Sequence, residues 1–511
     1  MSEIDFSNDY DRAVEGTYER READWRNGAI VYQILVDRFA PPADIEAKRH
    51  LYPAPKTLKS WHELPTRGHY LEDQKLWSHE IDFWGGDLAG VREKIDYIKN
   101  LNVDVVYLNP IHLSYTNHRY DALDYAVVTP EFGDREDVKQ LASTLHEYGM
   151  KLVLDGVFNH MGRNSERFKE AESNPDSEFR DWFFFGDEYP GGARSWWLAE
   201  NLPELNLENR QVRKYIYGGK NSIVRSFLRD GVDGWRLDVA VDIGMKYLEE
   251  LTYAAHDEKA GSLVIGEIAN YPKEWFPSVD AVMNFNLREI ILKMMSGDIE
   301  AAHAQRMINR MFGEPGYEHM LKSWIFLDNH DTARLTTSIP DWHRRHLAQV
   351  LQFTLPGAPN IYYGTEICME GGDDPEMRAP MRWEWISDHN SHLMWTKRLI
   401  QLHKDHRALR VGDYRPVEAN KLFGFERYTD RVDDTIIVLA NPGHETVTES
   451  VMIANSKLMN TFKLVDLMGD HSQSVNIYCG LITVTIPAGG FLVLTPDTNP
   501  VGGYTSYKRV K

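Results

Sequence analysis

Four short segments of the chain each end an apolar run on a carboxylate or an imidazole. They are Asp155-Gly-Val-Phe-Asn159-His160, Gly234-Trp-Arg236-Leu-Asp238, Ile265-Gly-Glu267 and Leu327-Asp-Asn-His330-Asp331. Hydrolysis of a glycosidic bond requires one ionised carboxylate beside the anomeric carbon and one protonated carboxylic acid beside the leaving oxygen. Each segment alone also fits a buried strand with an acidic cap. Four in order, separated by helix-sized stretches, predict a glycosidase.

Three carboxyl groups have different surroundings in these segments. Arg236 and Asp238 alternate with apolar residues, so a strand places both on one face, where the arginine is expected to favour the ionised form of the aspartate. Glu267 closes the apolar run 262–266, and partial desolvation there would suit it to proton donation. Asp331 ends the fourth segment and could stabilise a cationic transition state.

Composition and charge disfavour two classes of partner. The net charge is −20 over 511 residues, which argues against a basic face for nucleic acid or for an anionic membrane. A neutral sugar is indifferent to this charge. The 14 Trp and 25 Tyr residues supply aromatic faces that can stack on sugar rings.

The cysteines and apolar runs bear on location. Cys368 and Cys479 are the only two cysteines, so neither a disulfide framework nor a cysteine-based zinc site is expected. The N-terminal residues do not resemble a secretory signal, and no apolar run approaches the ~20 residues of a membrane helix. These features predict a cytoplasmic protein.

Strand and helix patterns alternate through most of the chain. Eight apolar runs predict strands at 29–38, 103–108, 151–155, 233–238, 263–267, 281–285, 323–327 and 360–363. Such alternation predicts an α/β fold, a (β/α)8 TIM barrel, whose active site lies at the carboxyl ends of the strands. The four acidic segments end there.

The remaining stretches predict the domain organisation. Residues 1–27 form an N-terminal arm, and 28–160 with 211–405 form the catalytic barrel. The stretch 161–210 is too long for a simple loop and predicts a small excursion domain, domain B, after strand 3. Short alternating runs in 410–500 predict a C-terminal antiparallel β-sandwich.

With these segments the chain resembles the α-amylase family of glycoside hydrolases, from about residue 25 to 495. The resemblance implies that Asp238 is the nucleophile, Glu267 the general acid/base and Asp331 the transition-state stabiliser. It also implies substrate contacts at subsite −1 from three further residues, Arg236, His160 and His330.

Other segments look like one branch of that family, the cyclomaltodextrinases, neopullulanases and maltogenic amylases. Thr116-Asn-His-Arg-Tyr120-Asp121 matches the branch segment whose tyrosine stacks on sugar, which implies this role for Tyr120. Asp374-Pro-Glu-Met-Arg378 is similar to its segment that grips glucose at subsite −2. Phe158 must lie at the rim and is a further candidate for substrate binding.

The chain departs from the branch in three ways. Only a short arm precedes the first strand, so an oligomer is not expected to form through an N-terminal domain. Asp238-Val-Ala-Val-Asp242 and Glu267-Ile-Ala-Asn270 carry unusual residues on the leaving-group side. The loop 37–44 lacks the oxygen-rich pattern of a calcium site, so no metal or other cofactor is expected to be required, although calcium elsewhere stays open.

The resemblance implies a retaining hydrolase that cleaves α-1,4 glucosidic bonds, with α-1,6 bonds as a second option, through a covalent glycosyl-enzyme. The expected substrates are small oligosaccharides, either cyclodextrins or maltooligosaccharides, in preference to long starch. An α-glucosidase or transglycosylase acting on short α-glucosides is the alternative, and a non-catalytic glucan-binding protein is a remote one. Candidate stacking residues are Trp61, Trp77, Trp84, Trp196 and Trp197.

Overall fold

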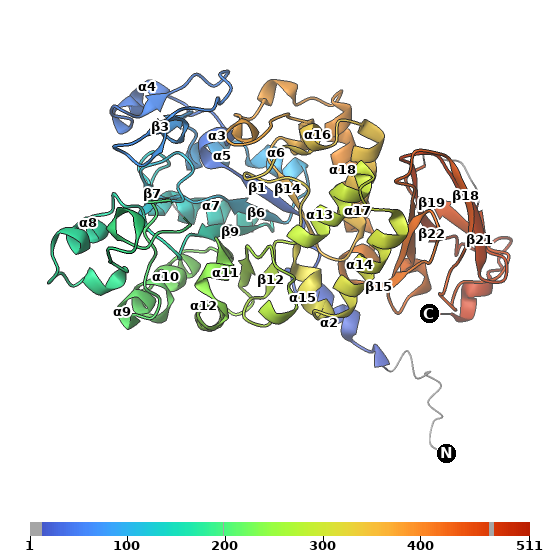
Figure 1. The fold of residues 1–511 in the computed structure, drawn as a ribbon. Coiled ribbons are helices and arrows are strands. Elements are labelled where there is room, and N and C mark those ends of the chain that lie inside the picture. The colour runs from blue at the N-terminus through green and yellow to red at the C-terminus, as the bar shows by residue number, and fades with distance from the viewer. Residues whose placement is uncertain (1–12, 198, 470–474, 511) are drawn as a thin grey trace, which may run out of the picture.

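The computed structural model describes residues 13–197, 199–469 and 475–510, and its centre is an eight-stranded parallel sheet (Figure 1). In sheet order the strands are β12 (Ala281–Val282), β11 (Leu263–Gly266), β10 (Gly234–Leu237), β9 (Lys151–Gly156), β6 (Val105–Leu108), β1 (Val31–Ile34), β14 (Ala358–Tyr362) and β13 (Trp324–Ile325). A parallel bridge between Met283 and Trp324 joins the two edges and closes the sheet. The predicted (β/α)8 barrel is confirmed.

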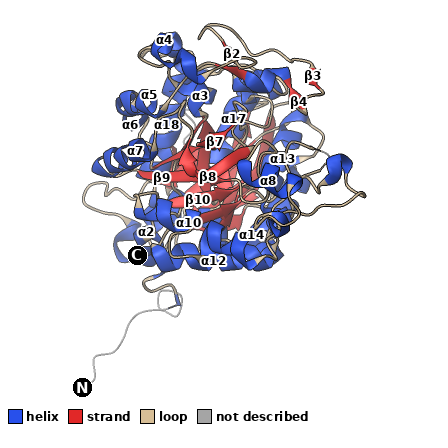
Figure 2. Cartoon of the chain, turned by 90° about the vertical axis from the view of Figure 1, so that its left-hand side faces the viewer, coloured by secondary structure: helices blue, strands red, loops and turns tan. Residues whose placement is uncertain are grey.

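Helices surround this barrel, as the ring of blue helices about the red strands in Figure 2 shows. They are α3 (Val36–Phe39), α5 (Leu88–Glu93), α6 (Ile95–Asn100), α7 (Arg135–Glu147), α9 (Arg210–Arg213), α10 (Ile223–Arg229), α11 (Ala240–Ile243), α12 (Met245–Glu258), α13 (Phe285–Ser296), α14 (Ala301–Gly313), α15 (Tyr317–Lys322), α16 (Leu335–Ser338), α17 (Trp342–Thr354), α18 (Ser391–Asp405) and α19 (Arg407–Val411).

Helix α7 shows how the sequence sets this outer layer. The side chain of Asp134 accepts hydrogen bonds from the amides of Glu136 and Asp137, which satisfies the free N–H groups at the helix start. The buried residues recur at three- and four-residue intervals and form one apolar stripe: Val138, Leu141, Ala142 and Leu145. That stripe packs toward the barrel.

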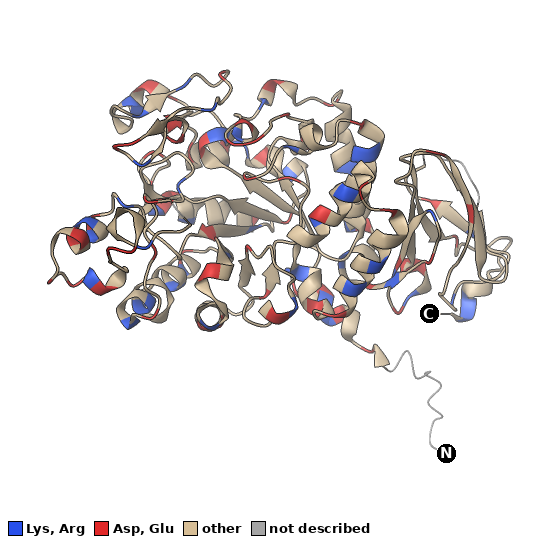
Figure 3. Cartoon of the chain, viewed as in Figure 1, with Lys and Arg blue, Asp and Glu red and all other residues tan. Residues whose placement is uncertain are grey.

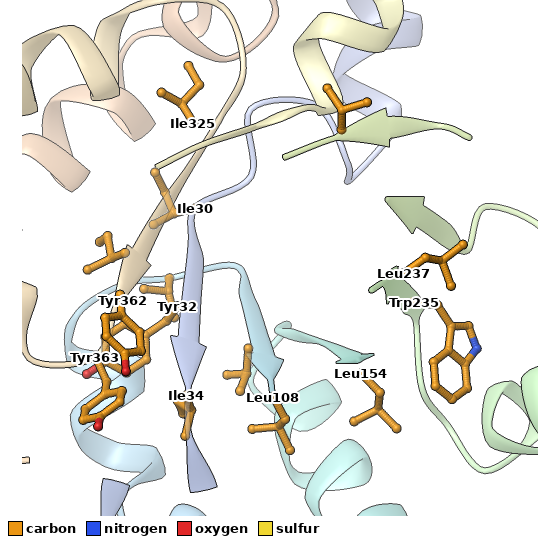
Figure 4. Packing of buried hydrophobic residues seen from close by; sticks show 14 of the residues in the cluster. Ile30, Tyr32, Ile34, Leu108, Leu154, Trp235, Leu237, Ile325, Tyr362 and Tyr363 are labelled. Atoms are coloured by element: carbon orange, nitrogen blue, oxygen red, sulfur yellow. The ribbon is translucent and has the colours of Figure 1, made fainter. Parts of the chain in front are cut away.

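The strands are apolar on both faces because both faces are covered. Tyr32, Ile34 and Leu108 point outward and pack with the helices (Figure 4), whereas Val31 and Tyr107 belong to a separate cluster inside the barrel. Full burial of each such aliphatic side chain contributes about 1.5–3 kcal/mol. Most of the predicted site residues lie at or beyond the ends of these strands.

Several insertions lie at the carboxyl ends of the strands, on the left of Figure 1. The connection between β1 and β6 contains α4 (Ile45–Lys48), β2 (Thr57–Leu58), β3 (Tyr70–Leu71), β4 (Leu76–Trp77) and β5 (Asp82–Phe83), and β6 is followed by the hairpin of β7 (His112–Ser114) and β8 (Ala122–Val128). The excursion after β9 contains α8 (Glu166–Ser173) and packs Phe168, Trp182, Phe183 and Leu205 together with the main core.

The C-terminal part is antiparallel, as predicted. One sheet has the order β15 (Asp413–Pro416), β16 (Phe423–Tyr428), β17 (Ile436–Ala440), β22 (Phe491–Pro496), β19 (Lys463–Asp466) and β20 (Val475–Asn476), and the other pairs β18 (Val447–Met452) with β21 (Leu481–Ile486). Ile437 and Leu439 point into the core between the sheets, whereas Ile436 and Val438 belong to the main core of the barrel. Alternate side chains of β17 thus pack on the two domains and join them.

Helix α2 (Thr17–Ala23) of the N-terminal arm is held by ion pairs. Arg21 contacts Glu318 at 2.8 Å and Asp413 at 2.9 Å, so it ties the arm both to α15 and to the first strand of the C-terminal sheet. Residues 1–12 of the predicted arm lie outside the described residues.

Basic and acidic segments are interspersed along the described chain (Figure 3). Among the described residues, every helix is too short or too polar to cross a bilayer.

Candidate active site

The carboxyl ends of the barrel strands open into a cavity with a volume of about 780 Å³. Seven of the ten predicted site residues line it: Tyr120, His160, Asp238, Glu267, Asp331, Asp374 and Arg378. Arg236 and His330 do not line the cavity but contact residues that do. These residues come from six different parts of the sequence, and the barrel brings them together.

Arg236, at the end of β10, is fully buried and joins three carboxylates. Its Nη1 lies 3.0 Å from Asp155 and 2.9 Å from Asp238, and its Nη2 lies 2.8 Å from Oε1 of Glu267. A buried guanidinium with three acidic partners leaves an excess of negative charge. The cluster is therefore suited to hold a proton or to stabilise a developing positive charge.

The protonation of Asp238 differs from the sequence expectation. The ion pair with Arg236 is present, but burial, together with the charges of Glu267 and Asp155, outweighs it and raises the pKa of Asp238 well above its usual range. The prediction that the arginine keeps this aspartate ionised was wrong for the free site, because it counted one neighbour and omitted desolvation and the two like charges. The like charges of Glu267 and Asp155 therefore favour a proton on Asp238 in the free site.

The amide of Val239 orients Glu267. It donates a hydrogen bond of 2.9 Å to Oε2, while Oε1 faces Arg236. Val239 has φ of 38°, in the left-handed region that a β-branched residue rarely adopts. Such a conformation costs about 1–3 kcal/mol and persists only where the surroundings impose it. Both carboxylate oxygens of Glu267 thus have fixed partners.

Asp331 lies between His330 and Arg378. Its Oδ2 is 3.0 Å from His330, and its Oδ1 is 3.1 Å from Arg378, which also contacts Asp374 at 3.0 Å. Burial raises the pKa of Asp331, but His330 and Arg378 outweigh it and hold the pKa below its usual range. Arg378, helped by His79, has the same effect on Asp374. Both aspartates are ionised at neutral pH.

The hydroxyl of Tyr120 connects the two halves of the site. It donates to Asp155 at 2.9 Å and lies 2.6 Å from Nε2 of His330. The rings of Tyr120 and His330 stack with centroids 5.4 Å apart and an angle of 8°. The cavity-lining ring is held rigidly, as a stacking surface for sugar requires.

His160 is buried beside the excursion domain. Its Nε2 lies 3.1 Å from the carbonyl oxygen of Tyr120, and its ring stacks on Trp196 with centroids 5.9 Å apart. Burial lowers the pKa of His160 to about 4. The imidazole is therefore neutral at pH 7 and acts as a hydrogen-bonding group without charge.

The placement of Phe158 in the substrate site was wrong. The residue is 1% exposed, does not line the cavity, and packs against Trp235 and Tyr125 with centroids 5.3 and 5.5 Å away. Burying an aromatic side chain in the helix layer is more favourable than exposing it at the rim. The position of Phe158 beside a rim residue in the sequence did not determine which way its side chain points.

The five tryptophan candidates differ in whether they line the cavity. Trp77 and Trp196 line the cavity, whereas Trp84 is buried under Arg38 and Trp197 is 82% exposed to solvent. Trp61 donates from its ring to the carbonyl oxygen of Met381 and does not line the cavity.

Sequence reasoning missed other cavity residues: Tyr70, Lys75, Glu80, Asn201 and Phe285. Most lie in the insertions, where no periodic pattern gave a signal. Phe285 ended a predicted strand, and this position at the rim could have identified it.

In the segment after β1, the carboxylate of Asp37 bonds to neighbouring protein groups. Asp37 accepts hydrogen bonds from the amides of Trp84 and Gly85 and pairs with Arg38 at 2.7 Å. Within the described part of the chain, no three His, Cys, Asp or Glu side chains are grouped as a metal site. That no cofactor is required stays a prediction.

Comparison with known proteins agrees with this geometry. Neopullulanase 2 of Thermoactinomyces vulgaris is 30% identical over 442 residues, which are 83% of this chain and 71% of that protein. Intracellular maltogenic amylase of Bacillus subtilis is 32% identical, over 92% of this chain and 77% of its own length.

A solved structure is similar over nearly the whole chain. Cyclic α-maltosyl-(1→6)-maltose hydrolase from Arthrobacter globiformis, in its ligand-free form, matches with a TM-score of 0.77 and 27% identity, over 93% of this chain and 100% of its own. The family profile of the α-amylase catalytic domain matches residues 33–411. The chain therefore belongs to the α-amylase family and is a glycoside hydrolase.

Proposed function

We propose that the enzyme is a retaining α-glucosidic hydrolase that acts on cyclodextrins or maltooligosaccharides. The observation that carries this proposal is the cluster of Asp238, Glu267 and Asp155 about Arg236, with Asp331 in the same cavity. Such a cavity offers a nucleophile, an acid and a stabilising carboxylate within one substrate-sized space.

The proposed mechanism is a double displacement, which begins when the proton of this carboxylate cluster lies on Glu267. Asp238 attacks the anomeric carbon while Glu267 gives its proton to the leaving oxygen, so the carbon–oxygen bond of the glycosidic link breaks as the ester to Asp238 forms. Glu267, now ionised, takes a proton from water, which attacks the ester and restores both groups. Asp331, held ionised by Arg378, stabilises the positive charge of each transition state.

The proposed substrates rest on the relatives. Their names describe a neopullulanase and a maltogenic amylase, and the structural neighbour named above is a cyclic α-maltosyl-(1→6)-maltose hydrolase. Tyr120 and the pair of Asp374 and Arg378 line the cavity, where they support the proposed contacts at subsites −1 and −2. Because this chain matches that neighbour along the neighbour's whole length, cyclic maltosides that contain α-1,6 bonds are a second proposed class of substrate.

The test measures products from β-cyclodextrin, cyclic α-maltosyl-(1→6)-maltose, pullulan, maltotriose and soluble starch, with the anomeric configuration followed by NMR. We expect α-configured products at the start of the reaction and faster turnover of the small substrates than of starch. Asp238→Asn should lose about four orders of magnitude in kcat or more. Equal rates for this variant, or endo-cleavage of starch without action on cyclic substrates, would contradict the proposal.

We further propose that the protein works in the cytoplasm, like the relative named as intracellular. Fractionation of the source cells, with the activity recovered outside the cytoplasmic fraction, would reject this location.

A further inference from the structure

The unusual residues after Glu267 lead from the catalytic cavity into a second one. Ala269 and Asn270 line the catalytic cavity, and the next residue, Tyr271, lines a separate cavity of about 470 Å³ between α13 and α14. The side chain at position 269 is only a methyl group, so it leaves space on the side where the leaving sugar lies.

The boundary between the two cavities repeats this arrangement on another element. Phe285 lines the catalytic cavity, and its neighbour Asn286 lines the second one. The amide nitrogen Nδ2 of Asn286 donates a hydrogen bond of 3.2 Å to the carbonyl oxygen of Ala269. The two cavities are therefore adjacent. Their boundary consists of two short segments, 269–271 and 285–286, which the hydrogen bond from Asn286 to Ala269 joins.

The lining of the second cavity combines apolar and hydrogen-bonding surfaces. Its apolar part consists of Ile290, Ile299, Met307 and Met311, and its polar part consists of Asn286, Glu289, Lys293 and Arg310. The hydroxyl of Tyr271 lies 3.3 Å from both Glu314 and the carbonyl oxygen of Arg310, which positions the ring at the cavity. A glucose unit presents one apolar ring face and an edge of hydroxyl groups, so both kinds of surface have a partner.

We propose that this cavity binds the glucose units of a maltooligosaccharide on the leaving-group side, beyond those held in the catalytic cavity, with Tyr271 as the stacking residue. The inference rests on the proposed function, because it assigns a second part of the same glucan. The neutral chain would enter past Ala269 and end between α13 and α14.

The first experiment compares Tyr271→Ala with Tyr253→Ala, a matched control on α12 whose ring is 71% exposed and lines neither cavity. The substrates are p-nitrophenyl α-maltoside, whose leaving group is short, and maltoheptaose labelled at its reducing end. We expect Tyr271→Ala to lower kcat/KM about three- to tenfold for maltoheptaose and less than about twofold for the maltoside. Cleavage of maltoheptaose should move toward the labelled end. Equal effects on both substrates, or none on either, would overturn the inference.

A second variant distinguishes stacking from structural damage. Tyr271→Phe keeps the ring and removes the contacts with Glu314 and Arg310, so it should retain the maltoheptaose activity. A loss as large as that of Tyr271→Ala would show that the hydroxyl contacts, not the ring, are needed, and would reject the stacking role.

Binding separates this inference from the proposed function. Calorimetric titration of maltoheptaose into Glu267→Gln, with and without Tyr271→Ala, requires no turnover. Weaker binding by the double variant supports the site even if the wild-type enzyme cleaves none of the proposed substrates. Equal binding rejects the site even if hydrolysis proceeds as proposed.

Discussion

At the residue scale, the orientation of His330 is set by Gln33 on strand β1. The amide nitrogen of Gln33 lies 3.1 Å from Oδ1 of Asn109 and 2.9 Å from Nδ1 of His330. With the amide oriented this way, the side chain donates to both atoms, so Nδ1 accepts and Nε2 carries the proton. That proton faces both the hydroxyl oxygen of Tyr120, 2.6 Å away, and Asp331, 3.0 Å away.

Replacing Gln33 with glutamate should therefore change the pH profile. A carboxylate can only accept from Nδ1, so His330 keeps its contact with Asp331 only when both of its nitrogens are protonated. We expect Gln33→Glu to lower kcat roughly tenfold or more at pH 7.5 and to shift the alkaline limb of the profile to lower pH. A uniform loss of kcat with an unchanged profile would mean that Gln33 has a packing role alone.

Single residues could be predicted where chemistry restricted their type and place. Asp238 and Glu267 ended predicted strands and Asp331 followed one closely, and the barrel brings all three into one cavity. Gln33 carried no such signal, because a glutamine inside a strand has many roles. Phe158 was misplaced because its direction depends on packing partners distant in sequence.

At the element scale, the excursion domain reaches the catalytic residues through Trp196. Its ring nitrogen donates a 3.0 Å hydrogen bond to Asp242 behind the nucleophile, and its ring stacks on His160. Trp196→Ala should raise KM for maltooligosaccharides about three- to tenfold, because the loop loses both anchors. The adjacent Trp197→Ala is the matched control, since its ring is 82% exposed. Equal changes in the two variants would refute an anchoring role.

The elements also show where sequence patterns stop being informative. Each barrel strand has a continuous apolar run because both of its faces are covered, and all eight were found. The insertion between β1 and β6 contains two-residue strands such as β3 and β4, which are too short to show a period. Its cavity-lining residues Tyr70 and Glu80 could be placed only by the fold.

At the scale of the whole molecule, buried histidines should make stability depend on pH. Burial lowers the pKa of His112 to about 4, and that of His160 likewise. His112 lies among the rings of Tyr125, Phe227 and Trp235. Between about pH 4 and 6.5 the unfolded chain binds a proton at each histidine that the folded chain does not, so stability rises with pH across this window and is complete above it.

Lowering the pH from 7 to 5 should therefore reduce the free energy of unfolding by about 2 kcal/mol for each of these two histidines. Urea unfolding followed by tryptophan fluorescence at both pH values measures the loss. His112→Phe keeps an aromatic ring in the cluster and should make the loss smaller by about 2 kcal/mol. His303→Phe, on an exposed position of α14, is the matched control and should leave the loss unchanged. If His112→Phe and wild type lose the same free energy, protonation of His112 in the unfolded chain does not contribute to acid sensitivity.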